Sequence, residues 1–241
     1  MLVSQGQIEL AMREAQLFVD DPTTAWSLAQ ALRNQGALKQ ALEIAELGLT
    51  LPGINNKGNL ALWTSELAEG LGKRAISLQA RITAFKEMPT LTDYLKLQEL
   101  EDPEEWPKLR KKLLAGLRKK HLFRSQPAVD IFLHEGLLKD AIKVVDQCSS
   151  YQSEPIHQVM EAAIASQPDW VIANACDRAE SIMDAGQANY YHHAVNWLKF
   201  AQRAYQQTDQ RQKWQTYYTK LRQKHDRKRK LIGLMNSLDQ R

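Results

Sequence analysis

Apolar residues that recur at helical spacing are the feature that most constrains the fold of this chain. In "TTAWSLAQALRNQGALKQALEIAELGLTLPG", residues 23–53, an apolar face runs up to Gly36 and a second one follows at Ala41, Ala45 and Leu49. Residues spaced by four lie on one side of a helix, and glycine commonly follows a helix C-terminus. The segment therefore predicts two antiparallel helices joined at Gly36, which end before Pro52.

The same hairpin pattern occurs twice more, in "LALWTSELAEGLGKRAISLQARITAF" (60–85) and "VDIFLHEGLLKDAIKVVDQC" (129–148). In all three segments an alanine lies five residues after a glycine, which gives the pairs Gly36/Ala41, Gly70/Ala75 and Gly136/Ala141. The first two glycines are 34 residues apart, the length of a tetratricopeptide helix pair, although the full tetratricopeptide pattern is absent. We interpret this as a degenerate helical repeat.

Strand signals are nearly absent from the sequence, because no β-branched run alternates with polar residues. Prolines punctuate the chain as far as Pro168, and none follows, so the longest helices are expected after it. The predicted fold class is all-α: an α-α superhelix, a tetratricopeptide-like solenoid of antiparallel helix hairpins, ending in a long helical hairpin. We predict one helical-repeat domain over residues 1–241, with degenerate hairpins in 1–168 and long helices with a basic end in 169–241.

Composition and cysteine use indicate a cytoplasmic protein. No window approaches the roughly 18 apolar residues that a membrane span requires, and the N-terminus lacks the features of a signal peptide. Cys148 and Cys176 are the only cysteines and lie 28 residues apart, which argues against a disulfide framework or a structural zinc site. We expect no membrane association, no cofactor and no metal.

The stretch "YYHHAVNWL", Tyr190–Leu198, is the part of the sequence that most resembles an active site. On a helix with 100° per residue, one apolar stripe holds Tyr190, Ala194, Trp197, Leu198, Ala201 and Tyr205. His192 then projects to the opposite, solvent side and His193 to the flank. Because adjacent histidines on a helix diverge, they do not share a metal ion as residues spaced by four do. We interpret the stretch as helix packing, and His134 and His157 as packing or solvated residues.

Positive charge is concentrated in two segments. Between Lys108 and Arg124 there are eight Lys or Arg residues and no acid, and between Lys199 and Lys230 there are eleven with only two acids. The first run is interpreted as a solvated helix face, opposite the buried stripe of Trp106, Leu109, Leu113 and Leu117. In the second, "KHDRKRK" (224–230) interrupts an amphipathic helix with cations on nearly every side.

This second run gives the candidate basic docking surface, which comprises Lys224, Arg227, Lys228, Arg229 and Lys230. It could be a solvated end of the solenoid, dock on an acidic protein partner, or bind nucleic-acid phosphates without reading bases. The neighbouring aromatic residues have core spacing and do not resemble a base-stacking platform.

The last part of the chain resembles the C-terminal helical region of bacterial and archaeal proteins that carry a SWIM-type zinc finger. The residues that carry the likeness are Tyr191, Ala194, Trp197, Leu198, Ala201, Tyr205, Trp214, Tyr217, Leu221, His225 and the following basic run. The resemblance implies a helical region that follows a finger engaging nucleic acid or protein. The finger's C-x-C and C-x-H are absent, so zinc is not expected here.

These observations predict a non-catalytic helical-repeat scaffold that binds an unidentified protein partner, as an accessory region of a SWIM zinc-finger-type protein. Stacked helix pairs offer extended surfaces for such recognition. The alternative function is nucleic-acid binding through Lys224–Lys230, with help from Lys108–Arg124. A second alternative, an uncharacterised enzyme, would require a histidine such as His134 or His193 in a cleft beside a carboxylate.

Overall fold

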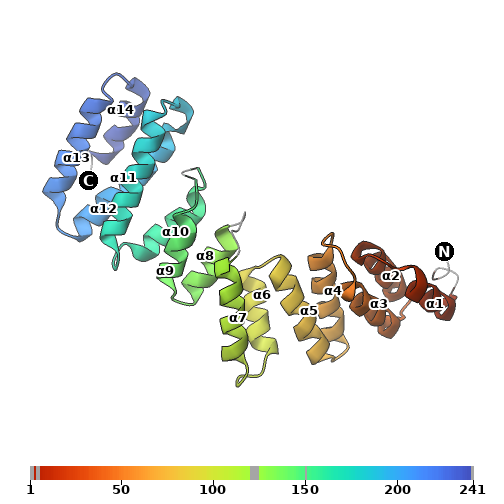
Figure 1. Cartoon of the computed structure of the whole chain (residues 1–241). Helices are drawn as coiled ribbons and strands as arrows, with labels where there is room; N and C mark the ends of the chain where they lie inside the picture. The colour runs from red at the N-terminus through yellow and green to blue at the C-terminus, as the bar shows by residue number, and fades with distance from the viewer. Residues whose placement is uncertain (1–2, 4–5, 120–124, 150, 240–241) are drawn as a thin grey trace. The chain divides into compact units, whose positions relative to one another are not determined.

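The computed structural model describes residues 3, 6–119, 125–149 and 151–239, and these residues form helices without any strand. The chain folds into two compact units, Met1–Leu122 and Phe123–Arg241, and each is described by itself (Figure 1). Consecutive helices pack in pairs in both units. The prediction of an all-α helical repeat is therefore confirmed, while the single domain over residues 1–241 stays a prediction.

The first unit contains seven α-helices in its described residues. They are α1 (Ile8–Phe18), α2 (Pro22–Asn34), α3 (Leu38–Thr50), α4 (Lys57–Gly70), α5 (Arg74–Glu87), α6 (Leu91–Leu100) and α7 (Trp106–Lys119). The pairs α2/α3 and α4/α5 make the most extensive contacts, and α4 also packs on α3. Asp21 caps α2 by accepting hydrogen bonds from the backbone N–H groups of Thr23 and Thr24.

The second unit contains another seven α-helices and two short 3-10 helices in its described residues. The helices are α8 (Ser125–His134), α9 (Leu138–Val145), α10 (Ser153–Ala163), α11 (Pro168–Asp184), η2 (Ala188–Tyr190), α12 (Tyr191–Gln207), α13 (Arg211–Lys224), α14 (Arg229–Met235) and η3 (Asn236–Leu238). The longest are α11 and α12, with 17 residues each, and they pair after Pro168, where the longest helices are expected. This hairpin does not end the fold, because α13, the short α14 and η3 follow it. Among the described helices, none combines the length and apolar composition needed to cross a bilayer.

The turns between paired helices share one backbone motif, and it corrects the repeat register expected from the sequence. Gly36, Gly72 and Gly136 have positive φ angles of 77°, 70° and 68°. After each glycine, the next N–H donates to the carbonyl five residues earlier, as in Ala37 to Leu32 at 3.0 Å. Gly70, which the sequence pattern predicts as the turn glycine of the second hairpin, is instead the last residue of α4.

The register shift also changes which small residue lies between the helices. Five residues after Gly72 comes Ser77, which is fully buried, whereas Ala75 is exposed. Ala41 and Ala141 are fully buried at the equivalent positions. Ser77 is small enough for the close approach, and its hydroxyl shares a hydrogen bond with Ser65 of α4 at 2.9 Å. The sequence pattern did not identify Ser77 because it requires an alanine at this position.

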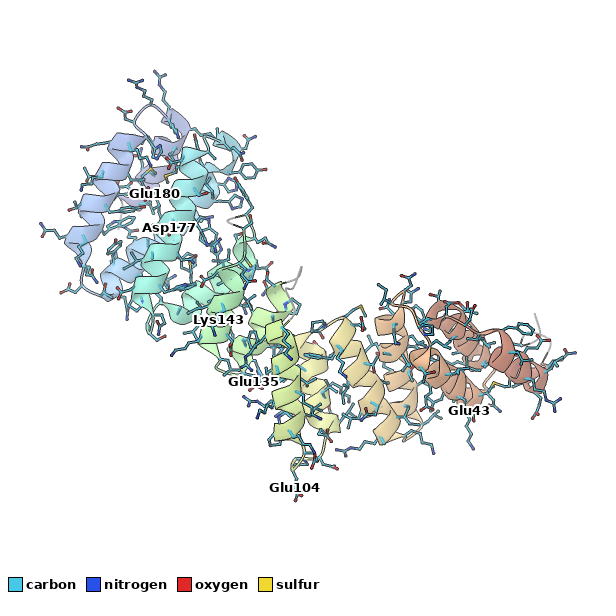
Figure 2. All side chains as sticks on the ribbon, viewed as in Figure 1. Glu43, Glu104, Glu135, Lys143, Asp177 and Glu180 are labelled. Atoms are coloured by element: carbon cyan, nitrogen blue, oxygen red, sulfur yellow. The ribbon has the colours of Figure 1, made fainter. Side chains whose placement is uncertain are left out.

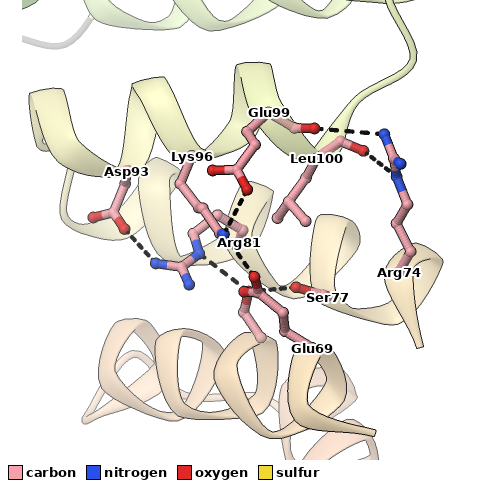
Figure 3. A network of polar contacts seen from close by, with 9 residues as sticks. Glu69, Arg74, Ser77, Arg81, Asp93, Lys96, Glu99 and Leu100 are labelled. Carbon is pink, nitrogen blue, oxygen red and sulfur yellow. Dashed lines mark hydrogen bonds and ion pairs between the residues drawn. The ribbon is translucent and has the colours of Figure 1, made fainter. Parts of the chain in front are cut away.

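A buried polar network fixes α5 against α4 and α6 (Figure 3). Arg81 of α5 donates to Ser65 Oγ at 3.1 Å and forms an ion pair of 2.7 Å with Asp93 of α6. Both charged side chains are about nine-tenths buried. Thr90 caps α6 by accepting from the Asp93 N–H at 3.0 Å, while its hydroxyl donates to the Asp93 carboxylate at 2.7 Å. Each member of the network is thus paired, as buried charges require.

Aromatic contacts continue from α5 through α6 to α7. The ring of Tyr94, fully buried in α6, lies 6.0 Å from that of Phe85 and 5.4 Å from that of Trp106, centroid to centroid. Trp106 is the first residue of α7. Tyr94 therefore connects α7 to α6 and, through Phe85, to α5.

Candidate functional site

The candidate basic docking surface divides into residues that hold the fold together and residues that face solvent. Helix α13 ends at Lys224 and α14 begins at Arg229, so the basic run forms a turn, not the continuous helix expected from the sequence. Lys224 Nζ lies 2.9 Å from Asp184 Oδ2 and 3.6 Å from Glu180 Oε2 (Figure 2 labels Glu180 on α11). Lys228 Nζ donates to the carbonyl of Met183.

These contacts place two cations at the C-terminal end of α11, where the helix dipole favours positive charge. The hydrogen bond from Lys224 holds the pKa of Asp184 below its usual range. His225 in the same turn is buried, with Nε2 at 3.5 Å from Asp184 Oδ1. Lys224 and Lys228 therefore already have partners within this unit.

Arg227, Arg229 and Lys230 are exposed and form no ion pair or hydrogen bond through their side chains among the described residues. They lie on the turn and on the first residues of α14. Of the five residues proposed from the sequence, these three remain available to a partner.

The histidine stretch follows the sequence prediction only in part, because the rings of His192 and His193 lie 4.0 Å apart, centroid to centroid, and do not diverge as expected. His192 is exposed, His193 is half-buried, and Trp197 and Leu198 are fully buried in α12. Tyr190, however, was wrongly placed in the apolar stripe, since it is 42% exposed. The reason is local: α12 begins only at Tyr191, and Tyr190 belongs to the 3-10 turn before it.

The other polar groups near this helix have packing roles. His157 of α10 lies with its ring 4.3 Å from that of Trp197 and stacked at 5.0 Å on Phe200. Burial raises the pKa of the Cys176 thiol to about 11, so it stays protonated and is a poor nucleophile. Among the residues that the structure describes, no three His, Cys, Asp or Glu side chains gather closely enough to hold a metal ion.

A concave groove lies between α5 and α7 in the first unit. It encloses about 390 Å³. Its floor comprises Phe85 of α5 and Leu113 and Leu117 of α7, each at most 5% exposed. The half-buried Ile82 and Leu109 line it as well. The floor is therefore apolar, and the groove follows one face of α7.

The rim of this groove carries charges of both signs. Helix α7 contains Lys108, Arg110, Lys111, Lys112, Arg118 and Lys119 and no acidic residue. Lys108 and Lys112 line the groove together with Glu101 and Glu105. Glu105 forms an ion pair of 3.2 Å with Lys108, and Glu101 accepts a hydrogen bond from the N–H of Asp102. Lys112 has no ion-pair partner in the described residues.

Gly116 opens the groove at its far end. It lies inside α7, is exposed, and a Cβ added there would meet no atom within 4 Å. Glycine inside a helix costs about 1 kcal/mol relative to alanine. At Gly48 and Gly58 packing accounts for this cost, because an added Cβ would come within 2.5 Å and 2.8 Å of neighbouring atoms. No contact within the described chain accounts for it at Gly116.

A second groove lies between α3 and α5 and meets the first at Gln79, which lines both. It encloses about 430 Å³ and contains Glu46, whose pKa is raised by burial and by the nearby Glu43. The groove along α7 thus has Lys108 and Lys112 at its rim, whereas the adjacent groove between α3 and α5 contains the acidic Glu46.

The groove along α7 is the site that sequence reasoning missed. The sequence predicts that the basic run Lys108–Arg124 is a solvated face, and its residues 120–124 lie outside the described part of the chain. Leu113 and Leu117 are buried as predicted, whereas Leu109 and Trp106 are half-buried. The available signal was Gly116, an unexplained glycine among strong helix formers and next to that stripe.

No family model matches the sequence, and a comparison with curated proteins likewise finds no significant match. Function is therefore inferred from the geometry of these surfaces.

Proposed function

We propose that this chain is a non-catalytic helical-repeat protein that binds another protein through the groove between α5 and α7. The observation that carries the proposal is the combination of an apolar floor with a charged rim along one helix. Such a surface resembles the core of a protein interface, where apolar anchors are buried and polar groups surround them. The two free cysteines, Cys148 and Cys176, are compatible with the cytoplasmic location that we propose.

A photo-cross-linker placed within the intact chain tests this function. Incorporated at Lys112, on the groove rim, it is expected to give a discrete adduct with a protein. The matched control is Lys39, an exposed lysine of α3 that does not line the groove. Equal adducts at both positions, or no protein adduct at Lys112, would contradict the proposal.

The second candidate function is nucleic-acid binding by the candidate basic docking surface. It is favoured by the exposure of Arg227, Arg229 and Lys230. Phosphate contacts release counterions, so binding should weaken steeply as salt rises. Replacing these three residues with glutamine should abolish binding to single- and double-stranded oligonucleotides, measured by fluorescence anisotropy. No binding by the unmodified chain at low salt would exclude this function.

We also propose an association with a SWIM-type zinc finger, supported by the sequence resemblance alone. A coding segment with C-x-C and C-x-H should then precede Met1 in the native chain or lie in a neighbouring gene. Its absence from both places would remove this proposal.

A further inference from the structure

The length of the groove between α5 and α7 matches that of a short α-helix. Its lining residues on α7 run from Lys108 to Leu117, a distance of about 14 Å at 1.5 Å per residue. A helix of roughly ten residues covers that length. Packed helices lie about 8–10 Å apart, and the smaller distances require small residues at the contact. Gly116 provides such a residue, with open space above it.

The floor selects a partner that has apolar side chains. Phe85, Leu113 and Leu117 leave little exposed area, and the half-buried Leu109 and Ile82 supply the contact surface above them. Apolar anchors spaced by three or four residues on a partner helix would face this surface, as in other helix-in-groove complexes. A nucleic-acid backbone has no groups that would bury against it.

The charge of the rim selects an acidic partner. Of the six cations of α7, only Lys108 and Lys112 line the groove, and Lys108 is paired with Glu105. The two glutamates at the groove already accept contacts within the chain, Glu105 from Lys108 and Glu101 from the Asp102 N–H. Lys112 remains without an ion-pair partner among the described residues and lies on the groove rim. A basic helix would meet like charges there, which disfavours its binding.

We propose that the occupant of this groove is an acidic amphipathic α-helix of a partner protein, which crosses α7 at Gly116 with its carboxylates facing Lys112. This inference rests on the proposed protein-binding function and specifies the chemical class of the partner. It also gives a reason for the glycine: the helix of the partner approaches where α7 lacks a side chain.

The test is a selection from a displayed library of helix-stabilised peptides of about 16 residues, with the full-length chain as bait. We expect the enriched peptides to carry Leu or Phe at three- and four-residue spacing on one face and Asp or Glu beside it. A synthetic peptide of the enriched consensus then serves as the probe in fluorescence anisotropy.

Three variants at the groove distinguish this mode of binding. Gly116→Trp fills the groove and is expected to raise the Kd of the consensus peptide at least about tenfold, the effect of a central interface residue. Lys112→Glu should raise it about tenfold through repulsion of the carboxylates. Gly116→Ala adds a methyl group where the partner helix approaches and should raise the Kd by a smaller factor, about fourfold, whereas Lys39→Glu on α3, outside the groove, should leave the Kd unchanged. Circular dichroism and urea unfolding verify that each variant is folded.

Other outcomes would overturn the inference. Enrichment of basic or neutral peptides, failure to enrich any peptide, or a consensus peptide that binds Gly116→Trp normally each contradicts an acidic helix in this groove. Displacement of the peptide by a single-stranded oligonucleotide, or a dimer of the chain that is lost with Gly116→Trp, would assign the groove to those occupants. A protein adduct at Lys112 together with a negative selection would leave the protein-binding function standing and reject only the acidic helix.

Discussion

At the scale of single residues, the buried pair Arg81–Asp93 shows what holds the first unit together. Its two charged groups are 2.7 Å apart and almost entirely shielded from water. Removing one charge from such a pair leaves the other without compensation, whereas replacing both with apolar groups is often neutral. The pair therefore matters because each buried charge has a partner of opposite sign, and not because the two residues are charged.

We predict that Asp93→Asn lowers the free energy of unfolding by about 3–5 kcal/mol, because the Arg81 guanidinium is left buried and unpaired. The double variant Arg81→Met/Asp93→Leu should recover most of the loss. The control is Glu69→Gln, which breaks the more exposed contact of Lys96 with Glu69 and should cost about 1 kcal/mol or less. Urea unfolding followed by circular dichroism measures all three, and a small effect of Asp93→Asn would contradict the prediction.

His157 gives the second unit a dependence of stability on pH. Burial lowers the pKa of His157 below its usual value, and the neighbouring His193 lowers it further. As the pH falls below about 6.5, the unfolded chain takes up this proton before the folded chain does. The free energy of unfolding therefore decreases as the pH falls from about 6.5 to the pKa of His157 in the folded chain. The stabilisation by neutral His157 is fully present only above the pKa that this residue has in the unfolded chain.

We predict that His157→Phe reduces this loss of stability between about pH 7.5 and 5.5, because the ring stays between Trp197 and Phe200 but no longer titrates. His157→Asn should reduce the pH dependence equally while lowering stability at both pH values, since it also loses the ring contacts. Urea midpoints at the two pH values measure both effects. A wild-type pH dependence in both variants would show that His157 does not cause it.

At the scale of helices, two glycines of the first unit should respond oppositely to the same substitution. A Cβ at Gly48 would lie 2.5 Å from Ala25 Cβ and 2.8 Å from Leu60 Cδ2, whereas one at Gly116 would meet nothing. We predict that Gly48→Ala destabilises by about 1–3 kcal/mol through overpacking. Gly116→Ala should instead stabilise by up to about 1 kcal/mol through helix propensity. Thermal and urea unfolding provide the measurement, and a change of the same sign at both positions would refute it.

The hairpins were predictable from the sequence because glycine has a local conformational role. Gly36 and Gly136 adopt the positive φ that ends a helix, which depends on neighbouring residues alone. Where two glycines follow closely, as at Gly70 and Gly72, the local pattern does not decide between them. The choice follows from tertiary packing, since only Gly72 brings Ser77 into contact with α4.

The candidate site was less predictable from the sequence because it also depends on tertiary packing. The groove depends on the approach of α7 to α5, which the contacts of Tyr94 with Phe85 and Trp106 establish. Helical periodicity identifies the buried Leu113 and Leu117 but cannot show that the adjoining space is left open. Likewise, charge counting identified the basic turn, but it could not separate Lys224 and Lys228, which stabilise the end of α11, from the exposed Arg227.

At the scale of the whole molecule, each unit has a buried core of its own. Large side chains that are fully buried include Leu32 and Tyr94 in the first unit and Phe132 and Trp197 in the second. Helical repeats bury their apolar faces mainly against adjacent helices, so stability is close to a sum over neighbours. The chain is therefore one domain if the two units unfold together, and two domains if each unit unfolds independently.

We predict that fragments Met1–Leu122 and Phe123–Arg241 each fold alone, because each is a compact unit whose helices pack mainly against one another. Each fragment should show a cooperative urea transition, and the sum of their far-ultraviolet circular dichroism spectra should match the full chain. Tryptophan fluorescence follows both, since Trp26, Trp63 and Trp106 report on the first unit and Trp170, Trp197 and Trp214 on the second. A fragment without a cooperative transition would show that it requires the other, and would favour the single domain over residues 1–241.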